Sequence, residues 1–382
     1  MIVGINRIFS QKNFERALFD FIRLLFIPRK IITFFSHLLP IFLFFSATIM
    51  SKLTSTSVLT SGAMKMPVIG LGTWQAGGDE IEKAVDHALS VGYRHLDTAY
   101  VYQNEESIGK VLKKWLSSGK IKREDLFITT KLPNTHNAAE LVESVLKKQL
   151  EWLNLDYVDL YLIHLPIRFK QDDTNPLPKD EQGNIIREPV DLISLWKAME
   201  AQVDAGRAKS IGLSNFNSKQ IANIVENARI KPANLQVELH VYLQQKELAK
   251  FCSQHGITIC GYAPLGSPGS KTFFKAVSNG ETELQNLNPL EEPVVQKIAA
   301  THKKTPSQVL LRFLLQEGFA VIPKSSNPQR IEQNLQVFDF ELSDQEVDTL
   351  RALDKGSSGR IFDFLFFPGV EKDENYPFNI PF

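Results

Sequence analysis

The sequence predicts an α/β protein, a (β/α)8 TIM barrel with a short N-terminal hairpin, extra helices and long loops at its C-terminal face. From residue 64 onward, eight short apolar runs alternate with longer amphipathic stretches, which is typical of a closed parallel barrel. An open doubly wound sheet would instead need a G-x-G-x-x-G turn directly after its first strand. The nearest match, Gly70-Leu71-Gly72, lacks the third glycine and lies inside a predicted strand.

The predicted strands are short and apolar at consecutive positions, as expected for strands buried on both faces. They are Val68–Trp74, His95–Ala99, Leu126–Leu132, Tyr157–His164, Lys209–Asn215, Asn234–His240, Thr258–Leu265 and Ala320–Ser326.

Apolar residues spaced by three and four predict helices between these strands. They are Asp79–Val91, Glu105–Ser117, Ala138–Leu153, Leu192–Ala205, Ser218–Asn227, Lys246–His255, Pro293–His302, Pro306–Gln316 and Ser343–Leu353. Two of them precede the eighth strand, so one is an extra helix, and the last follows the barrel.

Residues 51–382 are predicted to form one barrel domain, and residues 1–50 an apolar extension. The run Ile31–Ser51 contains no formally charged residue and is long enough to span a bilayer as a helix. Three interpretations remain open: a signal anchor, a targeting peptide, or a segment upstream of the native start. We favour a cytoplasmic domain that begins near Met50, so that any membrane contact is made only through residues 31–50.

Charge and cysteine content exclude several classes of partner. The 43 basic residues equal the 43 acidic ones, which gives no electrostatic reason to expect a nucleic acid partner. Cys252 and Cys260 are the only cysteines, too few for a disulfide framework or a zinc cluster. No metal site is expected.

Long connections follow strand four and strand seven, at the end of the barrel where such enzymes hold their active sites. These connections are Pro166–Val190 and Gly266–Glu292. The tail Lys355–Phe382 is rich in aromatic residues, and we expect it to pack against the domain.

Ionisable side chains converge at the same end of three neighbouring strands. Asp97 lies near the end of strand two, Tyr102 in the following loop, Lys131 at the end of strand three and His164 at the end of strand four. Taken singly, each is more often structural, but together they predict catalysis. We expect the Lys131 ammonium, held by Asp97, to lower the pKa of Tyr102 from about 10 towards neutrality, making it a proton donor. His164 would donate a hydrogen bond to the same substrate oxygen.

The end of strand eight predicts a phosphate site. Lys324, Ser325 and Arg330 lie where barrels commonly bind phosphate. Two cations suit a 2′-phosphate and therefore NADPH rather than NADH, although a solvated basic loop is the alternative interpretation.

Inward-facing groups on strands five to seven predict a nicotinamide site. Ser214, Asn215 and Gln236 would bind the carboxamide, and Tyr262 would stack on the ring unless it is an ordinary core residue.

Several long motifs resemble those of the aldo-keto reductases, over about residues 64–382. They are Gly92–Ala99 followed by Tyr102 and Asn104-Glu105, Met66–Trp74, Gly212–Phe216 and Ile322–Arg330. The resemblance implies a monomeric barrel with alcohol dehydrogenase (NADP+) activity, which reduces aldehydes or ketones with NADPH/NADP+ as cofactor. The alternative is a non-catalytic NADPH-binding or structural protein on the same fold.

The resemblance also implies roles for individual residues. The catalytic set would be Asp97, Tyr102, Lys131 and His164, and Trp74 would line the substrate pocket together with Tyr102 and His164. Contacts with the cofactor would come from Thr73, Ser214, Asn215, Gln236, Tyr262, Leu265, Ser267, Lys324, Ser325, Asn327, Arg330, Gln333 and Asn334.

Overall fold

The computed structural model describes residues 53–172, 174–270, 274 and 287–382. The chain divides into two units, Met1–Leu53 and Thr54–Phe382, and all the secondary structure given below belongs to the second. The predicted N-terminal extension, residues 1–50, lies outside the described residues. Among those that are described, no helix combines the length and the apolar character needed to cross a membrane.

Eight parallel strands form one sheet in the order β12-β11-β10-β9-β6-β5-β4-β3. They are β3 (Leu71–Gly72), β4 (His95–Asp97), β5 (Phe127–Leu132), β6 (Val158–Ile163), β9 (Ala208–Ser214), β10 (Asn234–Glu238), β11 (Thr258–Tyr262) and β12 (Ala320–Val321). Parallel bridges Ile69↔Val321 and Gly72↔Lys324 join the two outer strands. The predicted barrel is therefore confirmed.

Close approach at this seam requires a glycine. A Cβ at Gly72 would lie 2.6 Å from the backbone oxygen of Ile322, too close for any other residue. The backbone N–H of Gly70 donates to the oxygen of Val321 at 2.9 Å, which joins the first and last strands.

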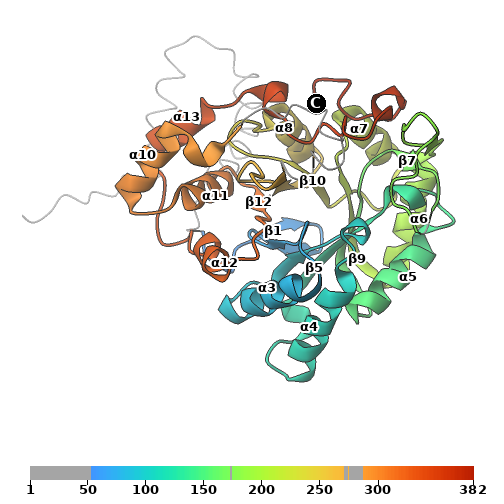
Figure 1. The fold of residues 1–382 in the computed structure, drawn as a ribbon, viewed down its shortest axis with the longest axis horizontal. Helices are drawn as coiled ribbons and strands as arrows, with labels where there is room; N and C mark the ends of the chain where they lie inside the picture. Colours follow the sequence, from blue (N-terminus) through green and yellow to red (C-terminus); the bar gives the residue numbers. More distant parts are fainter. Residues whose placement is uncertain (1–52, 173, 271–273, 275–286) are drawn as a thin grey trace, which may run out of the picture. The chain divides into compact units, whose positions relative to one another are not determined.

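Helices surround the strands, as Figure 1 shows. They are α3 (Gly78–Val91), α4 (Glu105–Ser117), α5 (Val142–Leu153), α6 (Leu192–Asp204), α7 (Ser218–Asn227), α8 (Lys246–Gln254), α10 (Pro293–His302), α11 (Pro306–Gln316), α12 (Pro328–Leu335) and α13 (Asp344–Arg351). Short 3-10 helices are Tyr100–Tyr102, Arg123–Asp125, Asn134–His136, Pro289–Glu291, Gly356–Gly359 and Val370–Lys372. Both α10 and α11 precede β12, as predicted.

The predicted bounds need correction in several places. Helix α5 begins at Val142 rather than Ala138, and α12 lies in a segment that apolar spacing does not predict as a helix. Of the eight barrel strands, seven end before their predicted last residue, and β5 ends at Leu132 as predicted. Residues in a left-handed conformation follow three of them: Gln75 after β3 (φ 62°), Asn215 after β9 (φ 60°) and Ala263 after β11 (φ 50°). Such strained residues gather at functional sites.

The N-terminal hairpin covers the amino end of the barrel. Strands β1 (Val58–Ser61) and β2 (Met64–Pro67) pair antiparallel around a two-residue turn that begins at Gly62. Met64 and Met66 are buried against strand residues such as Phe127. The opposite, carboxyl end of the strands is therefore the mouth of the barrel.

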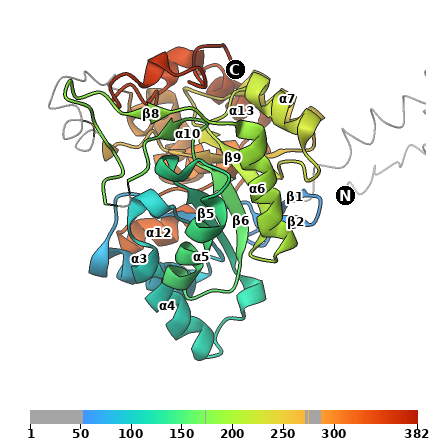
Figure 2. The ribbon, with the colours of Figure 1, turned by 90° about the vertical axis from the view of Figure 1, so that its right-hand side faces the viewer.

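The connection after β6 and the C-terminal tail pack against each other near that mouth, whereas most of the predicted connection Gly266–Glu292 lies outside the described residues. The connection after β6 contains the short antiparallel pair β7 (Arg168–Phe169) and β8 (Arg187–Glu188). Figures 1 and 2 show the C-terminal tail close to these strands and to α7, and Gln220 of α7 donates to the oxygen of Asn375 at 2.8 Å. The aromatic tail packs against the domain, as predicted.

Candidate active site

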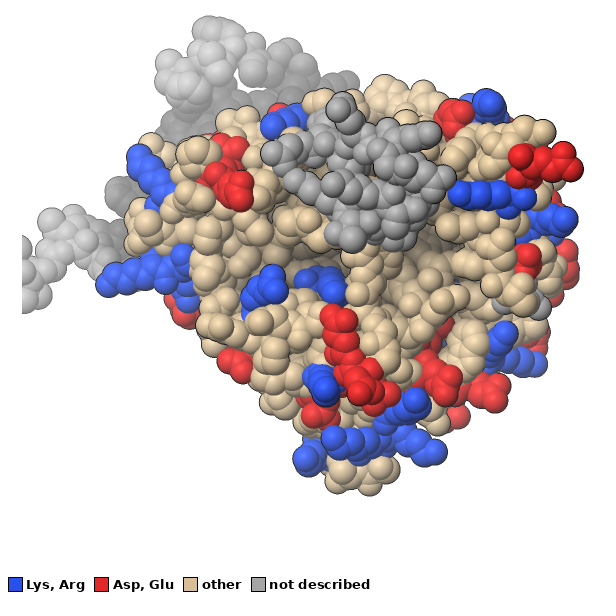
Figure 3. All heavy atoms as spheres, viewed as in Figure 1, with Lys and Arg blue, Asp and Glu red and all other residues tan. Residues whose placement is uncertain are grey.

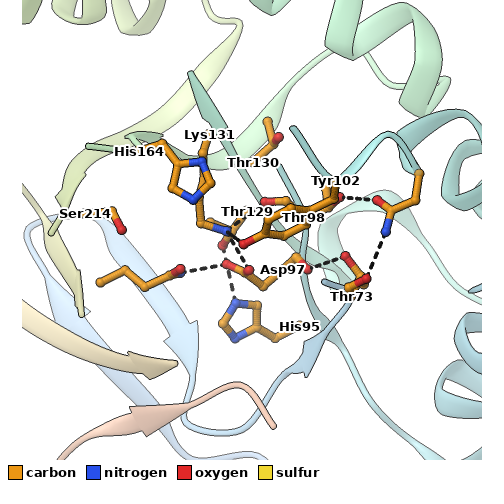
Figure 4. A network of polar contacts seen from close by, with 12 residues as sticks. Thr73, His95, Asp97, Thr98, Tyr102, Thr129, Thr130, Lys131, His164 and Ser214 are labelled. Carbon is orange, nitrogen blue, oxygen red and sulfur yellow. Dashed lines mark hydrogen bonds and ion pairs between the residues drawn. The ribbon is translucent and has the colours of Figure 1, made fainter. Parts of the chain in front are cut away.

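Four side chains converge at the carboxyl ends of adjacent strands, and we call them the rim cluster. Asp97 ends β4, Tyr102 ends the 3-10 helix that follows it, Lys131 lies in β5 and His164 directly follows β6. Figure 4 shows their side chains gathered in one place. The structure therefore brings together the four residues that the sequence predicts to act together.

The Lys131 ammonium connects the members of the rim cluster. Its Nζ lies 2.6 Å from Oδ1 of Asp97, 2.9 Å from the backbone oxygen of Thr98 and 3.4 Å from Oη of Tyr102. The ring of His164 packs edge-on against the ring of Tyr102, with centroids 5.9 Å apart. Lys131 and Asp97 are 0% and 2% exposed, so solvent screens this ion pair little.

Burial and charge set the protonation of the rim cluster. Burial lowers the pKa of Lys131, but Asp97 and Tyr102 outweigh it and the net pKa is raised, which keeps the ammonium charged. Burial, assisted by Lys131, holds the pKa of His164 well below its usual value and keeps the imidazole neutral.

The predicted lowering of the Tyr102 pKa is wrong in this structure. Burial raises that pKa, and although Lys131 lowers it as expected, the net pKa lies above its ordinary value. The reason is that removal from water disfavours the phenolate more than one ammonium at 3.4 Å favours it. The phenol keeps its proton, which is the state that a proton donor needs.

Two of the predicted cofactor residues hold Asp97 in place. Nε2 of Gln236 donates to Oδ2 of Asp97 at 2.7 Å, and the hydroxyl of Thr73 donates to the backbone oxygen of Asp97 at 2.9 Å. Asp97 thus accepts from Lys131 on one carboxylate oxygen and from Gln236 on the other. This arrangement fixes the carboxylate that pairs with the ammonium.

Asn104 is a positioning residue to which sequence reasoning assigned no role. Its buried amide donates to the backbone oxygens of Thr73 and Ala76, both at 2.9 Å, and accepts from the hydroxyl of Thr98 at 2.8 Å. It therefore connects the loops after β3 and β4. An Asn directly before helix α4 resembles a helix cap, but its side chain makes no capping bond.

The predicted nicotinamide residues form a second group at the mouth. The phenol of Tyr262 donates to Oδ1 of Asn215 at 2.8 Å, and the amide nitrogen of Asn215 donates to the backbone oxygen of His164 at 2.9 Å and to the hydroxyl of Ser214 at 3.1 Å. β9 and β11 are thereby tied to the rim cluster.

Two of the predicted phosphate residues, Lys324 and Arg330, form an exposed group after β12. Lys324 donates to the backbone oxygen of Gln75 at 3.4 Å and lies 3.8 Å from Oε1 of Glu80. The side chain of Asn327 caps α12 by accepting from the N–H of Arg330 at 3.0 Å. On the face shown in Figure 3, basic and acidic side chains are interspersed, without a continuous field of either sign.

The remaining predicted cofactor residues lie after β12, on α12 and after β11. Ser325 is buried, with its hydroxyl accepting from the N–H of Asn327 at 3.2 Å, and Gln333 and Asn334 lie on α12. Leu265 and Ser267 are half-buried in the segment after β11. Among the described residues, no hydrogen bond joins this set to the rim cluster.

Aromatic rings line the mouth beside the rim cluster. Trp74 is half-buried, and its ring packs edge-on against that of Phe362 in the tail, with centroids 5.5 Å apart. The ring of Tyr262 packs against the same Phe362 ring, with centroids 5.6 Å apart. Trp74 therefore lies beside the tail aromatics at the mouth, and its contact with substrate stays a prediction. Phe362 was anticipated only as one of the packing aromatics of the tail.

A second buried carboxylate, Glu105, is connected to Lys131 of the rim cluster through Gln149. Glu105 accepts from the hydroxyl of Thr130 at 2.6 Å and from the amide of Gln149 at 3.1 Å, and that amide also donates to the backbone oxygen of Lys131 at 3.2 Å. Burial raises the pKa of Glu105 to about 7. The sequence marks Glu105 only as part of a family motif and gives it no role of its own.

Comparison with known proteins reveals close relatives. The model of the Aldo/keto reductase family matches residues 68–355. Aldo-keto reductase family 1 member A1 of Mus musculus is 44% identical over 336 residues, which are 86% of this chain and 100% of that protein. Its counterpart in Gallus gallus is 46% identical over 324 residues, 83% of this chain and 96% of that protein. The solved aldose reductase of Schistosoma japonicum is 43% identical with a TM-score of 0.76, covering 85% of this chain and 99% of that one.

Proposed function

Because this chain belongs to the aldo/keto reductase family and is an oxidoreductase of carbonyl compounds, we propose that it reduces aldehydes or ketones to alcohols with hydride from NADPH and a proton from Tyr102. The observation that supports this most is the position of the Lys131 ammonium, 2.6 Å from Asp97 and 3.4 Å from the Tyr102 phenol. A lysine so placed favours transfer of the phenolic proton by stabilising the phenolate left behind.

The rim cluster divides the acid chemistry among its members. Tyr102 would donate its Oη proton to the carbonyl oxygen while the bound cofactor supplies hydride to the carbonyl carbon, so that C=O would become CH–OH. The ammonium of Lys131 stabilises the resulting phenolate, and Asp97 keeps that ammonium charged and oriented. Neutral His164 retains one N–H donor that can orient the carbonyl oxygen.

The cofactor supplies the hydride when bound, and the residues at the mouth suit it. The carboxamide would be held by the polar side chains of Ser214, Asn215 and Gln236, and the ring would stack on Tyr262. Nδ1 of His164, a buried polar atom without a hydrogen-bond partner among the described residues, is consistent with a site that receives polar ligands.

The phosphate groups would be held by the segment after β12. Lys324 and Arg330 are exposed cations at the N-terminal end of α12, where anions are favoured. A 2′-phosphate distinguishes NADPH from NADH and matches these two charges. Thr73, Leu265, Ser267, Ser325, Asn327, Gln333 and Asn334 complete the proposed cofactor contacts, and Trp74 lines the substrate side with Tyr102 and His164.

The test is a comparison of two tyrosine variants of the purified chain. Tyr102→Phe removes only the phenolic oxygen, so we expect turnover of NADPH with an aromatic aldehyde to fall by about 10³-fold or more while NADPH still binds. Tyr100→Phe is the matched control, because Tyr100 lies in the same 3-10 helix. Its ring packs against Trp152, with centroids 5.3 Å apart, and not against the rim cluster.

The outcomes separate the proposal from its alternative. Normal turnover by Tyr102→Phe would contradict Tyr102 as the proton donor. NADPH binding by the wild-type chain without reduction of any carbonyl in a broad panel would favour a non-catalytic NADPH-binding or structural protein.

We also propose that the chain works as a cytoplasmic monomer. Both of its cysteines are buried and unpaired, which fits a reducing compartment. Sedimentation of the purified chain and fractionation of cells test these two points.

A further inference from the structure

A buried carboxylate at the end of β10 binds the C-terminal tail by its backbone. Glu238 is 0% exposed. Its Oε1 accepts from the N–H of Ile361 and its Oε2 from the N–H of Phe362, both at 2.8 Å. These bonds join residues 123 and 124 positions apart in the sequence. We call Glu238 and its two backbone donors the tail anchor.

A third donor completes the surroundings of this carboxylate. Nε2 of His240 lies 2.9 Å from Oε1 of Glu238, while Nδ1 of His240 accepts from the N–H of Tyr242 at 3.3 Å. The Nε2 nitrogen therefore carries the proton and donates to Glu238. Among the described residues, Glu238 has no Lys or Arg within ion-pair distance.

Burial of a carboxylate is costly unless hydrogen bonds replace its water. Three N–H donors, two of them from the tail, replace that water at Glu238. The carboxylate thus depends on the tail being in place, and the position of the tail depends on the carboxylate. Such mutual dependence fixes the backbone of Ile361 and Phe362 more firmly than apolar packing alone would.

The anchored residue Phe362 is 7% exposed and packs against the aromatic residues of the mouth. The centroid of its ring lies 5.5 Å from that of Trp74 and 5.6 Å from that of Tyr262. Tyr262 in turn donates to Asn215, which donates to the backbone of His164. The tail anchor is therefore connected by direct contacts to the wall of the candidate active site.

We propose that Glu238 is a positioning residue that sets substrate preference by placing Phe362 at the mouth. An aromatic wall of Trp74, Tyr262 and Phe362 held in this position favours ring-bearing carbonyl substrates, which can pack against it, over small aliphatic ones, which offer it little surface. This inference rests on the proposed carbonyl reduction. Glu238 itself touches no reacting atom.

The test compares two aldehydes in the full chain with NADPH. In Glu238→Gln one oxygen is replaced by an amide that faces a backbone donor, so we expect the KM for benzaldehyde to rise about tenfold, with kcat changed less than about twofold. The kinetic constants for propanal should stay within about twofold of wild type. Hydrogen exchange of the peptide that contains Ile361 and Phe362 should become faster.

Two further variants separate positioning from general loss of structure. Glu292→Gln is the matched control, since Glu292 accepts from the Tyr242 hydroxyl at 2.6 Å beside the same segment and does not bind the tail backbone. Phe362→Ala should reproduce the change in preference, and Glu238→Gln added to it should have no further effect, because coupled residues are not additive. If Glu238→Gln does not accumulate, Ile361→Pro removes one donor of the tail anchor and should give the same shift.

The outcomes are distinct. Equal losses for both aldehydes, or effects of Glu238→Gln and Phe362→Ala that multiply, would overturn the inference and leave carbonyl reduction intact. An inactive wild-type chain would contradict the proposed function and this inference with it.

Discussion

The rim cluster and the segment after β12 both carry charges at the mouth of the barrel, but they hold them in different ways. Lys131 is 0% exposed and its nitrogen lies 2.6 Å from Asp97. The side chain of Lys324 is 34% exposed and lies 3.8 Å from Glu80, itself 54% exposed. The Lys131–Asp97 pair is fixed by the fold, whereas Lys324 can leave Glu80 and bind an anion instead. Under the proposed function, the buried charge would serve chemistry and the exposed charge would serve cofactor affinity.

Removal of the buried ammonium should give the largest effect. We expect Lys131→Met to lower kcat by about 10³-fold or more and to destabilise the fold by about 3–5 kcal/mol, because Asp97 is left as an uncompensated buried charge. Steady-state kinetics and chemical denaturation measure the two effects. Lys114→Met, which removes an exposed lysine from α4, is the control.

A double variant separates stability from chemistry in the rim cluster. Asp97→Asn combined with Lys131→Met removes both charges, so stability should return towards that of wild type while activity stays low. Recovery of activity along with stability would contradict a chemical role for Lys131.

The carboxylate behind Lys131 should make stability depend on pH. The pKa of Glu105 in the folded chain is about 7, above its ordinary value of 4.5. Its contribution to stability is therefore fully present below about 4.5 and is lost as the pH rises to about 7, by at most about 3 kcal/mol. Glu105→Gln should lose less stability than wild type between pH 5 and pH 8, about the two ends of this window.

The thermal unfolding midpoint at these two pH values measures the effect. Glu106→Gln, which changes the exposed neighbour, should behave as wild type. Identical pH dependence in Glu105→Gln and wild type would show that Glu105 does not titrate in this window.

Removal of an exposed cation should change affinity alone. We expect Arg330→Met to weaken NADPH binding by about tenfold, to leave the binding of NADH unchanged and to keep kcat within about twofold, because the charge acts on a phosphate remote from the proton donor. Fluorescence titration measures both affinities. Arg229→Met, which removes an arginine 59% exposed and paired with Asp204, is the control. An equal loss for both cofactors would contradict recognition of a 2′-phosphate at Arg330.

The rim cluster could be predicted from the sequence because its members mark strand ends. Apolar runs locate the strands, so the polar residues that end them stand out, as Asp97 and His164 do. The same reasoning misjudged where β9 and β11 end, because the left-handed conformations of Asn215 and Ala263 depend on contacts that form only in the fold.

Other features needed the structure. The pKa of Tyr102 depends on burial, which spacing does not report. The role of Glu238 depends on backbone donors more than 120 residues away. Helix α12 buries only Ile331 and Asn334. Its sequence therefore lacks the spacing of apolar residues that predicts a helix.

The most direct test of Tyr102 as a protonated donor is the single-turnover rate of NADPH oxidation against pH. Since the pKa of Tyr102 is raised above its ordinary value, the wild-type rate should stay constant from about pH 6 to about pH 9 and fall only above that range, and Tyr102→Phe should be slow throughout. A wild-type rate that falls with a midpoint near neutrality, or a Tyr102→Phe variant as fast as wild type, would contradict the account.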